Sequence, residues 1–414
     1  MPRRTLAVVG CLLLGSASLW AQTGIQRAKV KKVDAGQGVL ILTVDGKDQE
    51  FGVSADTRLM AGDGKALADG LKDSRLKEGT AVMFKAVSKD GKNLLIGLRL
   101  FDGDAGKGAK KDFVKKDTAK LKPLTAMGGA EYHGFKGGLY PDGKNERPAA
   151  HEKAGLALAQ SVQPLDGAGK PDPQGKIVLL GVGMSNTTQV FSAFKQQADA
   201  DKDRNPKLVI VDGAQGGMTA SRIMNPADNA SGTKYWSEVE RRLKMAGVTH
   251  DQVQVAWIKQ AEAGPSQGFP GYAKILQSNL TKLVQAMHAR FPNLKMVYLS
   301  GRTYGGYARS GLNPEPYAFE SGYSVKWLIE EQLKGEPALN FDSAKGNVSA
   351  PWLSWGPYLW ANGTTKNADG LFYEETDFAA DGTHHSPSGR QKVGAFILTF
   401  FKTDSTSRPW FLAR

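Results

Sequence analysis

The sequence predicts an α/β protein with a buried parallel sheet, preceded by a small all-β barrel. From residue 152 onward, short apolar runs alternate with amphipathic helical segments, which is typical of parallel strands joined by crossover helices. Residues 25–101 instead contain short β-type runs separated by turns. A stretch rich in Lys and Gly lies between the two patterns, so the 414 residues are expected to form two domains.

Residues 1–21 have the features of an export signal. Arg3 and Arg4 give a positive start, residues 6–14 form an apolar run too short to span a bilayer, and Ala21 ends a zone of small residues suited to cleavage. The only cysteine, Cys11, lies inside the apolar run, which continues past it, so cleavage is favoured over lipid attachment. No later segment has the length and apolarity of a transmembrane helix. We therefore expect a secreted or periplasmic protein without thiols, which excludes cysteine nucleophiles and thiolate metal sites.

Residues 25–101 predict the barrel. The apolar run 39–44 is followed by Asp45-Gly46, a strong hairpin signal, and by a second run at 48–53. Two further runs, 81–87 and 94–100, are separated by a turn at 89–92. A small closed or nearly closed barrel of the SH3 or OB kind is expected. It contains no catalytic constellation, and both an anchoring or ligand-binding module and a folded spacer remain open.

Residues 102–122 predict a linker. Seven lysines lie between Lys107 and Lys122, against Asp112 and Asp117. They contribute much of the formal net charge of +13, which becomes +11 (13 − 2) without the two arginines of the signal. A solvated linker is the favoured interpretation, with binding to an anionic surface or glycan as the alternative. No basic stretch has interleaved aromatic residues, so no nucleic-acid partner is expected.

Residues 123–414 predict the α/β domain. Helices are expected at 152–162, 189–198, 236–245, 272–290, 320–333 and 389–401. Strands are expected at 177–182, 208–211, 253–257 and 294–299. In an open parallel sheet, ligands bind at the carboxyl ends of the strands. Each predicted strand is followed there by polar or Gly-rich residues, which directs the search for chemistry to these four loops.

Two segments predict a hydrolytic triad. Ser185 follows the first strand at a strand-to-helix turn, where its hydroxyl would be exposed beside free backbone N–H groups. Far downstream, Asp381 and His384 lie three positions apart on a Gly-containing loop ahead of a helix. Ser185 is the candidate nucleophile, His384 the base, and Asp381 the residue that orients it. Gly216 or Gly217, after the second strand, would bring a further N–H to the oxyanion.

Each of these features has a simpler interpretation. A serine at a helix start is commonly an N-cap, and an Asp-Gly sequence before Ser-Pro is commonly a turn. Gly181 and Gly183 give an incomplete dinucleotide fingerprint, because Asn186 occupies the place of the third glycine, so no nucleotide cofactor is expected. The other histidines have no metal-ligand spacing, and no metal is expected. The joint occurrence of serine turn and Asp-x-x-His loop favours catalysis.

The segment from about 123 to 405 resembles the SGNH (GDSL-like) hydrolases. Gly183-Met-Ser185 stands where that family has Gly-Asp-Ser, and the Asp381-x-x-His384 block matches well. The resemblance implies a three-layer α/β/α sandwich and ester hydrolysis through an acyl-enzyme. The family's Gly-x-Asn-Asp loop is absent, and Gln260 is the amide that could replace its asparagine in the oxyanion hole.

The sequence thus predicts an exported serine esterase that acts on acyl groups, with acetyl groups of a carbohydrate as the leading candidate. Candidate substrate-binding residues are Asn186, Arg302 and Tyr304 at strand ends. Trp355 belongs to an aromatic insertion that could stack on sugars or form a buried loop core. The substrate would be a small-molecule or polysaccharide ester. The alternative is a noncatalytic glycan- or surface-binding protein on the same scaffold.

Overall fold

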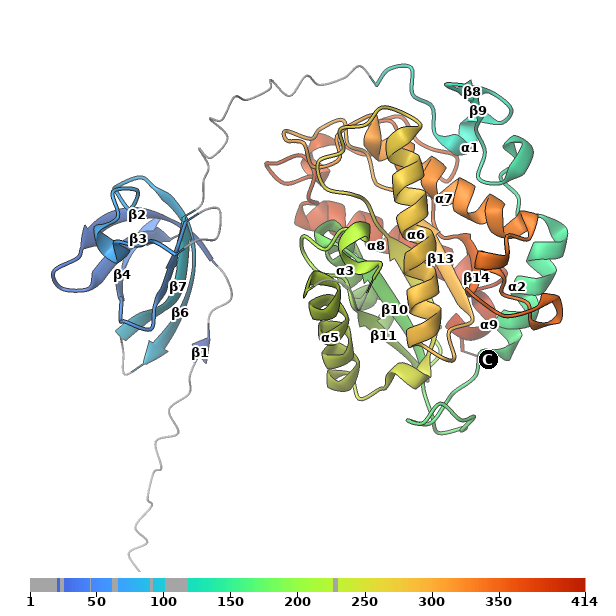
Figure 1. Ribbon diagram of the computed structural model, residues 1–414, viewed down its shortest axis with the longest axis horizontal. Coiled ribbons are helices and arrows are strands. Elements are labelled where there is room, and N and C mark those ends of the chain that lie inside the picture. Colours follow the sequence, from blue (N-terminus) through green and yellow to red (C-terminus); the bar gives the residue numbers. More distant parts are fainter. Residues whose placement is uncertain are drawn as a thin grey trace, which may run out of the picture. The chain divides into compact units, whose positions relative to one another are not determined.

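The computed structural model describes residues 21–22, 26–44, 46–61, 66–89, 92–100, 118–225 and 230–413. The chain divides into two units, residues 1–112 and 113–414, which are described separately (Figure 1). The export signal, except for Ala21, and linker residues 102–117 lie outside the described residues.

The first unit is a closed β-barrel. Its strands are β1 Ala21–Gln22, β2 Gln26–Asp34, β3 Val39–Val44, β4 Lys47–Gly52, β5 Arg58–Met60, β6 Ala81–Lys89 and β7 Lys92–Leu100. Their order is β1-β6-β2-β3-β4-β7-β5, and pairing of β6 with β7 closes a ring of five strands. Along β3, Leu40 and Leu42 point into the core, alternating with less buried neighbours. The predicted all-β barrel is confirmed.

Strand β2 is an addition to the predicted elements. Its sequence is rich in lysine, so the few apolar residues that face inward do not form a clear strand pattern. Ala28 and Val30 are buried in the barrel core. Their alternation with exposed Lys29 and Lys31 is the pattern of a half-buried strand.

The second unit contains a five-stranded, wholly parallel sheet. Its strands are β10 Ile177–Gly183, β11 Leu208–Asp212, β12 Val253–Lys259, β13 Met296–Ser300 and β14 Trp352–Trp355. Their order is β11-β10-β12-β13-β14. Every residue of β10 and β12 is buried, as expected for a sheet covered on both faces. The chain reverses direction across the sheet after β11, which places a topological switch between β10 and β12.

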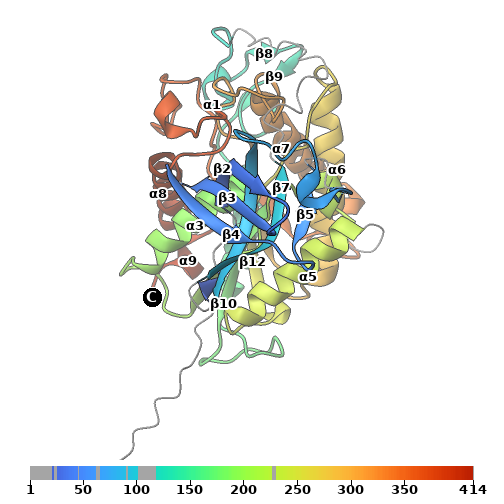
Figure 2. The same cartoon turned by 90° about the vertical axis from the view of Figure 1, so that its left-hand side faces the viewer.

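Helices cover both faces of this sheet. They are α2 Ala149–Ser161, α3 Ser185–Asp199, α4 Ala220–Ile223, α5 Ala230–Met245, α6 Gly271–Arg290, α7 Tyr317–Lys334, α8 Pro387–Thr403 and α9 Arg408–Phe411. In Figure 2, α3, α8 and α9 lie on one side of β10 and β12, and α5, α6 and α7 lie on the other. The predicted three-layer α/β/α sandwich is confirmed.

The main departure from the prediction is β14. The aromatic insertion was expected to be a loop, yet Trp352–Trp355 pairs in parallel with β13. All four of its residues are buried. The run is too short, and too close to Pro351 and Pro357, for its sequence to indicate a strand.

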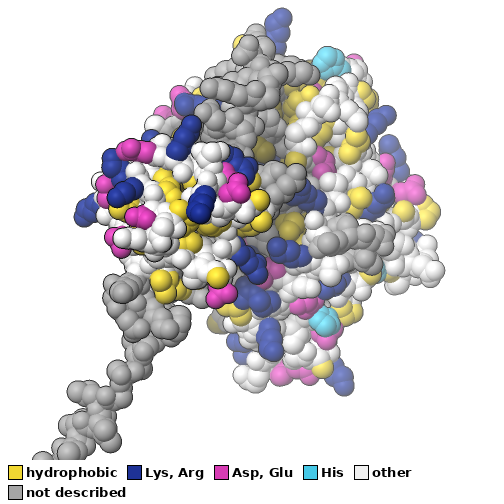
Figure 3. All heavy atoms as spheres, turned by 60° about the vertical axis from the view of Figure 1, so that its left-hand side comes forward, with side chains coloured by type: hydrophobic (Ala, Val, Ile, Leu, Met, Phe, Trp, Pro, Cys, Tyr) yellow, Lys and Arg dark blue, Asp and Glu magenta, His cyan; other side chains and the backbone are white. Residues whose placement is uncertain are grey.

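Charged side chains are mixed on the surface. In the face shown in Figure 3, Lys and Arg side chains are interspersed with Asp and Glu side chains. Among the described residues, no helix combines the length and apolarity needed to cross a bilayer.

Candidate active site

The candidate nucleophile Ser185 is the first residue of α3, directly after the carboxyl end of β10 and its extended N-cap residue Met184. The turn needs glycine at position 183. A Cβ there would lie 2.4 Å from the carbonyl oxygen of Lys259 and 2.5 Å from Oγ1 of Thr187. The close approach of β10 to β12, and not a nucleotide phosphate, therefore accounts for this glycine.

The loop with the acid and the base is held by its own hydrogen bonds. Oδ1 of Asp381 accepts from the backbone N–H of Thr383 at 3.0 Å and of His384 at 2.9 Å. Gly382 has a φ of +65°, and a Cβ there would lie 1.8 Å from the carbonyl oxygen of Tyr307. Only glycine fits at this position, so Gly382 allows the tight turn of the loop. In this turn the Asp381 and His384 side chains point toward each other.

The three side chains form a continuous hydrogen-bonded triad. Ser185 Oγ lies 2.7 Å from His384 Nε2, and His384 Nδ1 lies 2.6 Å from Asp381 Oδ2. Partial burial acts to raise the pKa of Asp381, but hydrogen bonds from His384 and Thr383 outweigh it and hold this pKa below its ordinary value. An ionised carboxylate only accepts, so Nδ1 of His384 carries the proton and Nε2 can accept the serine proton.

Backbone donors surround the serine. The N–H groups of Ser185, Gly216 and Gly217 have no hydrogen-bond acceptor among the described residues. A Cβ at Gly216 would lie 3.8 Å from Ser185 Cβ, and Gly217 has a φ of +75°. Because these glycines have no side chains, the loop after β11 can come close to Ser185, as an oxyanion hole requires.

The expected role of Gln260 in the oxyanion hole is wrong. Its Nε2 donates to the carbonyl oxygen of Met218 at 3.0 Å, and its Oε1 accepts from the N–H of Ala261 at 3.2 Å. The amide available near the serine is that of Asn186. Lys259 Nζ donates to Asn186 Oδ1 at 2.9 Å, which leaves Nδ2 of Asn186 without an acceptor among the described residues.

A cavity of about 130 Å³ opens beside the triad. Ser185, Asn186, Gly217, Arg302 and His384 line it together with residues that the sequence did not single out. The latter are Met184, Thr219, Arg222, Glu262, Ala263, Leu312, Asn313 and Thr383. Arg222 donates to the carbonyl oxygen of Gly217 at 2.8 Å and so supports the glycine loop. No sequence signal distinguishes Arg222, because its place in the site depends on how α4 packs.

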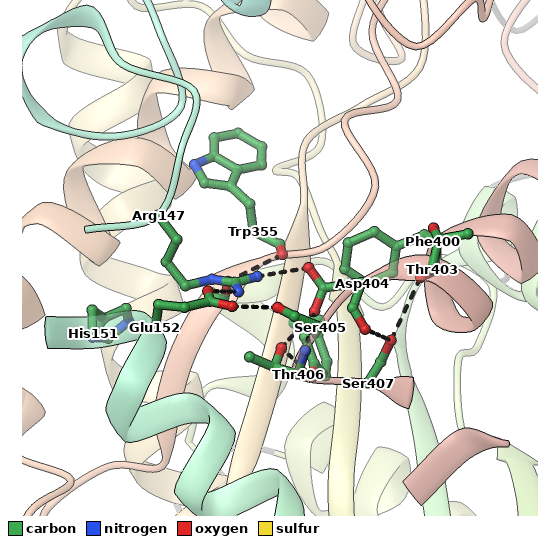
Figure 4. A network of polar contacts seen from close by, with 12 residues as sticks. Arg147, His151, Glu152, Trp355, Phe400, Thr403, Asp404, Ser405, Thr406 and Ser407 are labelled. Carbon is green, nitrogen blue, oxygen red and sulfur yellow. Dashed lines mark hydrogen bonds and ion pairs between the residues drawn. The ribbon is translucent and has the colours of Figure 1, made fainter. Parts of the chain in front are cut away.

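Two predicted substrate-binding residues do not line this cavity. Tyr304 is buried, and its hydroxyl lies 3.1 Å from Oγ1 of Thr118. Trp355 is buried and donates to the carbonyl oxygen of Leu139 at 2.6 Å. It lies near Arg147 (Figure 4), and both line a separate cavity of about 610 Å³. Packing at the end of the sheet, and not substrate, accounts for both side chains.

The histidines and carboxylates around the triad do not form a set of metal ligands in the part of the chain that the structure describes. Within the described parts of the chain, no three His, Cys, Asp or Glu side chains are grouped as metal ligands would be. His385, next to the catalytic base, is fully buried, and burial together with the nearby cations lowers its pKa well below the ordinary value.

Comparisons with known proteins give partial similarities. No family model and no curated protein matches the chain. Among solved structures, the lipase Lip_vut3 from a goat rumen metagenome is 13% identical, with 54% of this chain and 97% of that chain covered and a TM-score of 0.33. The periplasmic domain of a lipopolysaccharide acetyltransferase from Salmonella ser. Paratyphi A is 11% identical, with coverage of 60% and 94% and a TM-score of 0.29.

The barrel region has similarities of its own. Apo-CusF from Escherichia coli is 15% identical, with 22% of this chain and 99% of that chain covered and a TM-score of 0.17. All of these TM-scores are below 0.5, so the functional conclusions below rest on the geometry of the site.

Proposed function

We propose that this chain is an exported serine esterase, which transfers an acyl group from an ester to Ser185 and then to water. The observation that carries the proposal is the continuous triad, with 2.7 Å from serine to histidine and 2.6 Å from histidine to aspartate. Export follows from the basic and apolar start of the sequence.

In the first half-reaction, Ser185 Oγ attacks the ester carbonyl carbon while its proton passes to His384 Nε2. The carbonyl oxygen becomes an oxyanion, which the N–H groups of Ser185 and Gly217 and Nδ2 of Asn186 are placed to stabilise. The carbon–oxygen bond to the alcohol then breaks, and the departing alkoxide takes the proton from His384. Asp381 stays ionised and stabilises the imidazolium.

In the second half-reaction, water replaces the alcohol. The water oxygen attacks the acyl carbon while His384 takes a proton from this water. Collapse of the new tetrahedral intermediate breaks the bond to Ser185, which recovers its proton, and releases the carboxylic acid. The same N–H donors stabilise the oxyanion in both half-reactions, and His384 transfers the proton in both.

The cavity favours small acyl groups. Its volume of about 130 Å³ is below the roughly 300–1,000 Å³ of typical pockets for small-molecule ligands, which favours an acetyl or similarly short group. That the alcohol is a carbohydrate remains a prediction of the sequence. The tryptophans that suggested it are buried, so they do not support stacking on sugars.

The test is active-site labelling combined with substitution. A fluorophosphonate probe should label the protein at Ser185, as located by peptide mass spectrometry. Hydrolysis of 4-nitrophenyl acetate should fall by at least about 10³-fold in Ser185→Ala, with the unfolding midpoint kept. A folded protein that is neither labelled nor active on a panel of acetylated sugars and aryl acetates would refute the proposal and favour a binding protein on this scaffold.

A further inference from the structure

The cavity beside the triad contains a buried cation without a partner. Arg302, directly after β13, is 3% exposed. Its Nε is buried without a hydrogen-bond partner, and none of its guanidinium nitrogens has an acceptor or an ion-pair partner among the described residues. A guanidinium has five N–H donors, and burying them unpaired is strongly unfavourable unless something else binds them.

Glu315 attracts Arg302 electrostatically, but among the described residues it forms no hydrogen bond or ion pair with it. Glu315 is buried close by, but its carboxylate accepts from the N–H groups of Gly305 and Phe319 and from Trp360 Nε1. Burial raises the pKa of Glu315 against the effect of these bonds. Its carboxylate is therefore fully engaged elsewhere.

Two other basic residues lie near Arg302 or line the same cavity. Lys259 is fully buried, and burial and the nearby Arg302 lower its pKa well below the ordinary value. Arg222 lines the same cavity. The one carboxylate in the cavity lining, Glu262, is held by Ser221 and by Asn279. An anion that entered the cavity would meet unpaired donors.

We propose that the ester substrate contains a carboxylate close to the scissile bond, and that Arg302 binds this carboxylate inside the cavity. The inference rests on the proposed esterase function and adds the substrate class. A planar guanidinium matches a carboxylate through two parallel hydrogen bonds, and Arg302 lines the same small cavity as Ser185. A neutral ester would leave the buried donors of Arg302 unpaired and is therefore a poorer substrate.

Two pairs of esters test the preference and locate the carboxylate. Ethyl hydrogen succinate and its carboxamide, ethyl succinamate, place the group on the acyl side. Acetoxyacetate and 2-acetoxyacetamide place it on the alcohol side. At least one acid should have a kcat/KM at least about tenfold above that of its amide. A ratio near one in both pairs would overturn the inference even though the esterase function stood.

Substitution of Arg302 assigns the preference to this residue. Arg302→Met should bring the favoured acid-to-amide ratio close to one, and Arg302→Lys should restore part of it. The matched control is Arg241→Met, which removes the same charge from an exposed site on α5, outside this cavity, and should keep the ratio. Survival of the full preference in Arg302→Met would contradict the assignment.

A binding experiment separates this inference from the esterase function. All four esters are titrated calorimetrically into Ser185→Ala, which cannot turn them over. One acid should bind at least about tenfold more tightly than its amide, and Arg302→Met in the same background should remove the difference. If neither acid binds more tightly than its amide, or neither acid binds at all, the inference is wrong. If the acid binds but the wild type hydrolyses nothing, only the esterase function fails.

Discussion

Two arginines of the α/β unit, the largely buried Arg147 and the buried Arg302, have opposite surroundings. Arg147 has every part of its guanidinium engaged: Nη2 donates to Asp404 Oδ2 at 2.9 Å, Nε donates to Ser354 Oγ at 2.8 Å, and Nη1 pairs with Glu152 (Figure 4). Arg302 has no such partner among the described residues. The first arginine ties together α2, β14 and the end of α8, and the second faces the cavity beside Ser185.

The comparison shows which region stabilises the fold and which is prepared for a ligand. Donors that are satisfied internally contribute to stability, and their loss leaves partly buried carboxylates without a partner. Donors that are left open are unfavourable for folding and become favourable only when a ligand binds them. Substitutions in the two regions should therefore change different quantities.

The largest effect on stability is expected at Arg147. Arg147→Met should lower the free energy of unfolding by about 3 kcal/mol, because the partly buried Glu152 and Asp404 would lose their cation. Urea denaturation monitored by fluorescence measures this value. The exposed pair of Arg309 with Glu375 supplies the control, since Arg309→Met should change it by less than about 1 kcal/mol. Equal effects of the two substitutions would show that the buried network is not structural.

The next effect is on catalysis, at Asn186. Asn186→Asp keeps an acceptor for Lys259 and removes the Nδ2 donor from the cavity. It should reduce kcat by about 10²–10³-fold, as expected for one oxyanion donor. Gln260→Met tests the rejected alternative and should leave kcat nearly unchanged, because Gln260 does not line the cavity. Steady-state kinetics on a good ester substrate decide between the two amides.

A smaller effect depends on pH and arises at His151, next to the Arg147 network. Burial lowers the pKa of His151 to about 4, although its hydrogen bond to the carbonyl oxygen of Leu353 acts in the other direction. The unfolded chain takes up a proton below about pH 6.5, whereas the folded protein does so only near pH 4, so stability is lost between these values.

The loss due to His151 should be up to about 3 kcal/mol. We would compare the unfolding free energies of the wild type and His151→Gln at pH 7 and at pH 4.5. The wild type should lose more stability than the variant on acidification, since the other titrating groups are common to both. Identical losses would mean that His151 is not the group responsible.

The smallest effect on stability is expected at Arg302. Arg302→Met removes a buried charge that has no partner among the described residues, so the unfolding free energy should stay within about 1 kcal/mol of the wild type or rise. The same urea titration used for Arg147 measures it. A loss as large as that of Arg147→Met would erase the contrast between the two regions.

The sequence predicted the parts of this protein that depend on local patterns. The alternation of apolar runs and helical segments predicted the parallel sheet, and the three-residue spacing of Asp381 and His384 predicted their shared loop. Both features are determined by neighbouring residues. Ser185 was found because it follows a buried strand at a strand-to-helix turn, at the edge of a parallel sheet where ligands bind.

Features that depend on distant packing could not be predicted. The orientation of the Gln260 amide is set by the loop around Met218, and the placement of Trp355 is set by Leu139, far away in the sequence. The sequence could not show that the guanidinium of Arg302 lacks a partner among the described residues, because this depends on which side chains the fold brings near it. The amide of Asn186 was visible next to the nucleophile, but its role depends on Lys259 from another strand.

The helices that begin beside the nucleophile and the base, α3 and α8, pack so closely that a Cβ at Gly394 of α8 would lie 2.8 Å from the backbone nitrogen of Phe194 in α3. This contact joins segments about 200 positions apart, from opposite ends of the α/β unit. During synthesis the serine is therefore made long before its base, and it has no base until α8 docks. The proposed esterase activity therefore requires that the loop with Asp381 and His384 has been made and that α8 has packed against α3.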